Sequence, residues 1–246
     1  MKNLFSALLF TAGLAGAATT AQAQAAFSIG PRLGVNMATV KTSGENASEV
    51  NPENIFTPQV GVTLDMSFGN NFAFQPSLLY SQKGFKTSES GTQTFNGVTV
   101  TYSGSSSLRI GYIELPLNFV YTTGGTQGFQ VFAGPYVAMG VGGRAPYELS
   151  VKDNTGQFDM KDSGAYSVKF ANQESSNGNG DEIYVRRFDI GANVGMGYRQ
   201  GPVQVQLGYG FGLSNIVPLD SNGSDSGDKA HNRVLQLSAN YFFGGK

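Results

Sequence analysis

"VQVQLGYGFGLSNI", residues 203–216, alternates apolar side chains with small or amide side chains at a period of two. One face of an extended strand would carry Val203, Val205, Leu207, Tyr209, Phe211 and Leu213, and the other Gln204, Gln206, Gly208, Gly210, Gly212 and Ser214. The alternation runs for about twelve residues, whereas a half-buried strand in a soluble protein usually shows it for about four to eight. The stretch therefore predicts an unusually long strand with one apolar and one polar face.

Seven further segments repeat this pattern: residues 27–38, 59–68, 72–82, 112–121, 129–141, 187–199 and 234–243. The links between the eight segments are alternately short (69–71, 122–128 and 200–202) and long (39–58, 83–111, 142–186 and 215–233). An even number of strands with alternating short turns and long loops is typical of outer membrane barrels. In lipid such a sheet must close, because an open edge leaves backbone groups unpaired. We predict an all-β fold, an eight-stranded antiparallel up-and-down transmembrane β-barrel, with termini and short turns in the periplasm.

A soluble lipocalin-like barrel or sandwich is the alternative interpretation of the alternation. The composition argues against it, because the polar faces carry Gly, Gln, Ser and Asn instead of the Lys and Glu of a water-exposed face. Charged residues make up 13% of the chain, against about 25% in ordinary soluble proteins. The net charge of −1 gives no basic surface for nucleic acid. The chain has no cysteine, which excludes disulfides and thiolate metal sites.

Aromatic residues gather near the expected strand ends. A periplasmic belt would comprise Phe27, Phe68, Phe72, Tyr121, Phe129, Tyr198, Tyr241 and Phe243, and an outer belt Tyr80, Tyr112, Phe188 and Phe211. Such girdles are typical of membrane barrels.

The first 25 residues have the order of a cleaved signal peptide. Lys2 supplies a positive start, residues 4–18 form an apolar run, and 21–23 or 23–25 gives a small-x-small cleavage site. We therefore expect a signal peptide at 1–25, an outer membrane barrel domain at 26–246, and export to the cell outer membrane.

Strand parity points seven charged side chains into the lumen: Arg32, Asp65, Lys83, Glu114, Arg187, Asp189 and Arg199. We expect Arg32 and Asp65 to pair, with Glu114 reaching the same cluster, and Lys83, Arg187 and Asp189 to lie nearer the outer rim. The set is either an ion-selective path or a paired core that closes the barrel. Its mixed signs favour the core, because buried charges need partners. Glycines of 187–199 and 203–216 would leave room for large side chains such as Tyr136, Arg187 and Arg199.

Candidate catalytic residues are scarce. His231 with Asp225, Asp228 or Ser226 imitates the rim site of barrel enzymes that modify lipid A or cleave proteins, where an imidazole base activates water or a hydroxyl. A solvated histidine in a polar loop explains the same residues, and we predict no enzymatic activity. The acidic loop 220–228 lacks the spacing of an EF-hand, so we expect no metal and no cofactor.

Five segments together resemble the PorT-like outer membrane β-barrel family of Bacteroidetes. They read "RLGVNMA" (32–38), "YIELPLNFVY" (112–121), "VFAGPYVAMG" (131–140), "FDIGANVGMGY" (188–198) and "LGYGFGLSNI" (207–216). The resemblance implies an eight-stranded outer membrane barrel without an assigned activity in most members. The secretion role of the founding member is not carried over, because the shared residues belong to the barrel itself. The chain departs from the usual aromatic C-terminus, since Gly244, Gly245 and Lys246 follow Phe243.

Three functions follow as hypotheses. The first is a structural or surface-interaction protein that contacts protein partners through its long extracellular loops, with residues 94–104 continuing the wall as a sheet whose edge recruits partners by strand addition. The second is a narrow solute channel or an accessory of protein secretion, and the third is the rim enzyme. We expect outer membrane lipid as a partner, no nucleic acid, and a monomer.

Overall fold

The computed structural model describes residues 26–44, 51–125, 127–175 and 180–244. The expected signal peptide at 1–25 lies outside these residues and stays a prediction. No helix in the described ranges is long and apolar enough to cross a membrane. The strands are β1 (Ala26–Ser43), β2 (Ile55–Phe68), β3 (Phe72–Phe95), β4 (Val98–Gly124), β5 (Gln127–Asp153), β6 (Asp159–Phe170), β7 (Glu182–Val185), β8 (Phe188–Gln200), β9 (Val203–Gly212) and β10 (Lys229–Tyr241).

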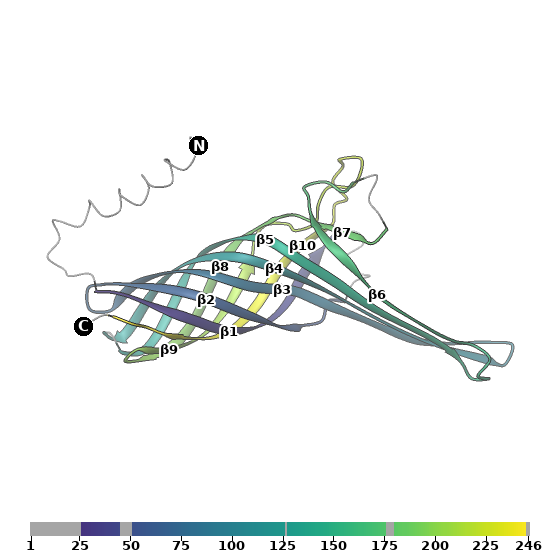
Figure 1. The fold of residues 1–246 in the computed structure, drawn as a ribbon, viewed down its shortest axis with the longest axis horizontal. Coiled ribbons are helices and arrows are strands. Elements are labelled where there is room, and N and C mark those ends of the chain that lie inside the picture. The colour runs from purple at the N-terminus through teal and green to yellow at the C-terminus, as the bar shows by residue number, and fades with distance from the viewer. Residues whose placement is uncertain (1–25, 45–50, 126, 176–179, 245–246) are drawn as a thin grey trace.

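A closed antiparallel barrel forms from β1, β2, β3, β4, β5, β8, β9 and β10, in that order, with β10 paired back to β1. The predicted eight-stranded up-and-down barrel is therefore confirmed, and each of the eight expected segments lies on one of these strands. Figure 1 shows the tilted strands, with the short turns and the C-terminal end gathered at one end of the barrel. The alternation of residues 203–216 predicts a strand that continues to Ser214, whereas β9 ends at Gly212.

The side chains of the wall follow the predicted parity. Leu207 is 44% exposed and Leu237 is 55% exposed on the outside, whereas Gln206 is 1% exposed. An apolar exterior around an amide-lined interior suits a barrel solvated by lipid. Tyr112 is a correction to the predicted outer belt: it is fully buried, because it shares the inward parity of Glu114.

The long links 83–111 and 142–186 differ most from expectation, because much of them is strand. β3, β4 and β5 continue far past the barrel, and β6 pairs with β5 from Arg144 to Lys152. The result is a four-stranded sheet of residues 85–108 and 145–166, called the arm below, which projects from the end opposite the short turns (Figure 1). The strand predicted over 94–104 is confirmed except at the turn residues 96–97. The rest escaped prediction because Ser- and Thr-rich strands with water on both sides show little apolar contrast.

Candidate functional site

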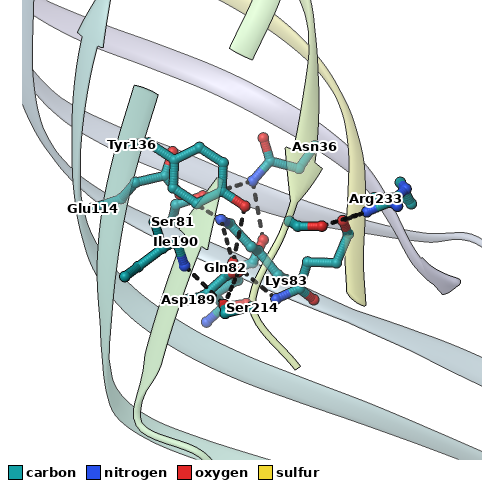
Figure 2. A network of polar contacts seen from close by, with 12 residues as sticks. Asn36, Ser81, Gln82, Lys83, Glu114, Tyr136, Asp189, Ile190, Ser214 and Arg233 are labelled. Atoms are coloured by element: carbon teal, nitrogen blue, oxygen red, sulfur yellow. Dashed lines mark hydrogen bonds and ion pairs between the residues drawn. The ribbon is translucent and has the colours of Figure 1, made fainter. Parts of the chain in front are cut away.

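The lumen holds a buried cluster of three charged residues contributed by three strands. Lys83 Nζ of β3 lies 2.7 Å from the Glu114 carboxylate of β4 and 3.0 Å from the Asp189 carboxylate of β8. All three residues are at most 1% exposed. One ammonium group therefore serves two carboxylates that approach it from different walls, as Figure 2 shows.

Neutral donors complete the shell of Asp189. Its Oδ2 accepts hydrogen bonds from Tyr136 Oη at 3.1 Å and from Asn232 Nδ2 at 2.9 Å, and its Oδ1 accepts one from Ser214 Oγ at 3.3 Å. The Tyr136 ring also lies 4.1 Å from Lys83 Nζ, a cation–π distance. With Glu114, five strands (β3, β4, β5, β8 and β10) and the segment after β9 thus contribute side chains to one point of the lumen, several of which Figure 2 shows.

Glu114 depends on Lys83 far more than Asp189 does. Apart from Lys83, neither oxygen of its carboxylate has a hydrogen-bond partner among the described residues, so the 2.7 Å ion pair is its main compensation. A buried carboxylate without a partner is strongly unfavourable. Lys83 is therefore the residue on which this part of the lumen relies.

Nearer the short turns, amide side chains fill the lumen. Arg32 donates to Gln59 Oε1 at 3.3 Å and to Gln206 Oε1 at 3.2 Å. Gln204 donates to Gln130 at 2.7 Å and to Gln75 at 3.2 Å. The Gln204–Gln75 bond connects opposite walls, because β9 and β3 lie four strands apart in the ring, whereas Gln59 lies on the strand next to Arg32.

The lowest charged pair joins Arg199 of β8 to Asp65 of β2 across the lumen at 2.5 Å. Gln75 Nε2 and Ser28 Oγ also donate to the Asp65 carboxylate, at 2.9 and 3.4 Å. The Arg199 guanidinium stacks over Phe242 at 4.7 Å. This pair closes the lumen at the end of the barrel where the short turns lie.

One predicted contact and one predicted inward position are wrong. Asp65 pairs with Arg199 and not with Arg32, because Arg32 lies opposite Gly61 while Asp65 lies opposite Ser28. That offset of four residues is about 13 Å along a strand. Arg187 does not join the network: it is exposed and its guanidinium lies 5.7 Å from the Phe170 ring. Arg187 directly precedes β8 and lies beyond the buried Asp189, at an exposed position.

The six remaining residues of the predicted set lie inside the barrel and balance in charge: Arg32, Lys83 and Arg199 against Asp65, Glu114 and Asp189. The cluster of Arg32, Asp65 and Glu114 that the sequence suggested is divided among different partners, because Asp65 pairs with Arg199 and Glu114 with Lys83. Glu114 still acts electrostatically on Arg32. The alternation along a strand predicts whether a side chain points into the lumen, but not its position along the barrel axis.

Glycines of β8 and β9 make the space for large inward side chains, as predicted for Tyr136. A Cβ at Gly191 would lie 2.6 Å from the Tyr136 ring, and one at Gly195 would lie 2.4 Å from Cζ of Phe132. Any larger residue at these positions collides with an aromatic ring that fills the lumen.

The residues of the candidate rim site lie on β10 and in the loop before it. Among the described residues, no hydrogen bond or ion pair joins His231 to Asp225 or Ser226. His231 lies opposite Lys41 at the end of β10. In the acidic loop, the Asp220 carboxylate accepts the N–H groups of Asn222 and Ser224, so it serves the turn. The described ranges contain no group of three His, Cys, Asp or Glu residues arranged to hold a metal.

The arm carries functional candidates that sequence reasoning missed. The register places Tyr102, Val151 and Met160 side by side on the face that continues the lumen. On the same face, Leu149 lies one position nearer the barrel than Val151. Tyr147 lies one position nearer still, with its ring centroid 5.2 Å from that of Tyr166 in a tilted arrangement. Tyr102, Leu149 and Met160 are exposed. The opposite face carries mainly Ser, Thr, Lys and Arg, so the arm has one apolar and one polar face.

A closed barrel with an apolar exterior, aromatic ends and a neutralised polar lumen defines an integral membrane protein of the outer membrane type. The chain belongs to the family described as outer membrane protein beta-barrel domain, whose family model matches residues 21–217. It is a protein of the cell outer membrane.

No curated protein matches the sequence. Among solved structures, the attachment invasion locus protein Ail of Yersinia pestis is 11% identical with a TM-score of 0.37, over 89% of this chain and 99% of that one. Neisserial surface protein A is 11% identical with a TM-score of 0.35, over 87% of this chain and 97% of that one. The outer membrane protease OmpT of Escherichia coli is 8% identical with a TM-score of 0.31, over 92% and 99%.

Proposed function

We propose that this protein is a non-enzymatic surface-interaction protein, in which a closed barrel anchors the arm and the arm binds a protein partner. The observation that carries this proposal is the unpartnered apolar face of the arm. Tyr102, Leu149 and Met160 are each about two-fifths exposed on strands that extend past the barrel. Exposed apolar surface rimmed by polar residues is typical of interaction sites.

The edges of the arm support the same function. Within the described ranges, β6 pairs with β7 only over residues 167–170, so residues 159–166 pair with β5 alone. On the other side, residues 87–95 of β3 pair only with β4 in the part of the chain that the structure describes. An open sheet edge accepts an extended segment of a partner by strand addition. We propose that the partner binds through an added strand whose alternate side chains contact the apolar face.

The lumen contents support the role of the barrel as an anchor. An eight-stranded barrel leaves an interior that side chains just fill, and here the buried Arg32 and Lys83 and the partly buried Arg199 balance three buried anions. A path that passed solutes would have to break the Arg199–Asp65 pair and the amide bonds above it. We therefore propose a lumen closed to solutes.

A narrow channel is the second candidate, and one observation favours it. Several buried lumen atoms have no protein partner among the described residues, including Asn118 Oδ1, Asn193 Oδ1 and Ser238 Oγ. Buried polar groups of this kind bind ordered water. Such water would hydrate the lumen without opening it, which is why we place the channel second.

We also propose that the chain belongs to the PorT-like branch of its family, on the five ordered segments given above. These segments give no support to a role in secretion, because their residues form the wall of the barrel. Within the described ranges His231 makes no hydrogen bond or ion pair with Asp225 or Ser226, and we propose that this residue is a solvated part of the rim.

A truncation tests the function. The register pairs Thr87 with Ser106 and Tyr147 with Gly164, so residues 88–105 and 148–163 can each be replaced by an Asn-Gly turn that joins paired positions. The shortened protein should keep the heat-dependent gel mobility of a folded barrel and lose the products of surface cross-linking that the full chain gives in intact cells. Equal cross-linking by both proteins would refute the proposal.

A further inference from the structure

Two arginines face each other on the outer surface where the arm leaves the barrel. Arg109 of β4 lies directly opposite Arg144 of β5 in the register. Both are exposed, and their chain neighbours Ile110 and Ala145 are buried at 1%, so the arginines point outward. Like charges directly opposite each other destabilise a strand pair.

Neither guanidinium is neutralised by the protein. Within the described ranges, no hydrogen bond or ion pair involves the side chain of Arg109 or Arg144. In the register of the sheet, Gly84 on β3 lies opposite Arg109, and Ser167 on β6 lies opposite Arg144. Glu182 on β7 lies opposite Ser167. Glu182 is two strands from Arg144 and is 3.5 Å from Lys169, so it does not serve the arginines.

The height of the pair matches the headgroup layer of the membrane. Tyr121 is an outward aromatic residue at the other end of β4, 12 residues from Arg109. With a rise of about 3.3 Å per residue and a tilt of about 40°, that separation is about 30 Å along the barrel axis, against an apolar band of about 25 Å. The last large outward apolar residue of β4 below the pair is Ile113. The guanidinium groups therefore lie just above the hydrocarbon.

The surroundings suit an anion. Gly84 has no side chain over the strand next to Arg109, and Ser107 and Ser167 place hydroxyl groups at neighbouring positions of the same face. Guanidinium groups bind phosphate oxygens through paired N–H donors, and hydroxyls add further donors. A phosphate group between the two arginines would turn a repulsive pair into a shared site.

We propose that Arg109 and Arg144 form a clasp for the phosphate of an anionic lipid headgroup in the outer leaflet. The site is independent of the partner surface proposed above. Because β4 and β5 are also the central strands of the arm, a bound phosphate fixes the root of the arm at the membrane surface.

Titration by native mass spectrometry of the purified full chain in detergent tests the clasp. The probes are bisphosphorylated lipid A, its dephosphorylated form, and inorganic phosphate. Arg109→Gln and Arg144→Gln should each weaken lipid A binding about tenfold, and the double variant about 100-fold, given the usual strength of hydrogen bonds to charged groups. Lys161→Gln is the matched control, because Lys161 is an exposed cation on the same face farther along the arm.

Three results would overturn the proposal. Wild-type affinity in the folded double variant, or in both folded single variants if the double variant does not fold, would show that the arginines do not bind the lipid. Equal affinity for dephosphorylated lipid A would remove the phosphate from the site. Displacement of lipid A by millimolar inorganic phosphate would reassign the clasp to a free anion.

Discussion

Replacement of Lys83 by methionine tests the buried charge cluster most severely. Methionine keeps the length and apolar stem of lysine and removes the ammonium group that contacts Glu114 at 2.7 Å and Asp189 at 3.0 Å. Removing one partner of a buried ion pair costs about 3–5 kcal/mol. Because one ammonium serves two carboxylates, we expect the free energy of unfolding to fall by about 5 kcal/mol.

The two carboxylates should contribute unequally to this loss. Asp189 retains its hydrogen bonds from Tyr136, Asn232 and Ser214, whereas Glu114 retains none among the described residues. Adding Glu114→Gln to Lys83→Met should therefore recover more stability than adding Asp189→Asn. In the triple variant Lys83→Met, Glu114→Gln, Asp189→Asn, the free energy of unfolding should return to within about 2 kcal/mol of the wild-type value. Replacing both partners of a buried pair is close to neutral.

The chain has no tryptophan, so the assay is urea unfolding in lipid vesicles, followed by the gel mobility that separates folded from unfolded barrels. Lys161→Met, at an exposed position of the arm, is the control and should change stability by less than about 0.5 kcal/mol. If Lys83→Met is no more destabilising than this control, or if the triple variant is less stable than the single variant, the reasoning fails.

Further predictions concern packing, the lower pair and the tip of the arm. Gly195→Val should lower the free energy of unfolding by about 1–3 kcal/mol, since its Cβ would collide with Phe132; an unchanged urea midpoint would contradict this. Arg199→Gln should cost about 3 kcal/mol, because it removes the cation that faces the Asp65 carboxylate and leaves only the hydrogen bonds from Gln75 and Ser28; the same unfolding assay measures it. At the tip, the Thr155 hydroxyl donates to Asp153 at 2.6 Å and lowers the pKa of that carboxyl. This bond therefore stabilises the turn above the ordinary pKa of Asp and is lost as the pH falls through the lowered one. Carboxyl NMR titration should show Thr155→Ala raising the pKa of Asp153, and an unchanged value would count against the bond.

The wall of the barrel could be predicted from the sequence, because outward side chains face lipid and must be apolar, whereas inward side chains face a polar lumen. Leu207 is exposed on the outer surface and its neighbour Gln206 is buried in the lumen. This alternation of environment appears in the sequence as an alternation of apolar and polar residues. Closure then follows from the need to pair every backbone group in hydrocarbon.

The contacts within the lumen could not be predicted, because parity gives the direction of a side chain and not its height. Asp65 was correctly placed inside the barrel and assigned to the wrong cation. The stagger between β1 and β2, which puts Ser28 opposite Asp65, depends on how the whole ring closes. Tyr112 was placed outside for its aromatic character, although its parity with Glu114 already indicated the lumen.

The arm was predicted only in part, for a related physical reason. Water on both faces of its strands allows Ser and Thr at most positions, so the sequence looks like a polar loop. The apolar row of Tyr102, Val151 and Met160 comes from three different strands, and no single segment of the sequence reveals it.

Planar-bilayer recording of the purified full chain tests the closed lumen most directly. We expect a baseline without discrete conductance steps, because Lys83 and Arg199 are paired with carboxylates at two levels of a filled interior. Regular ohmic steps from the wild-type protein would contradict it and would make the barrel a channel.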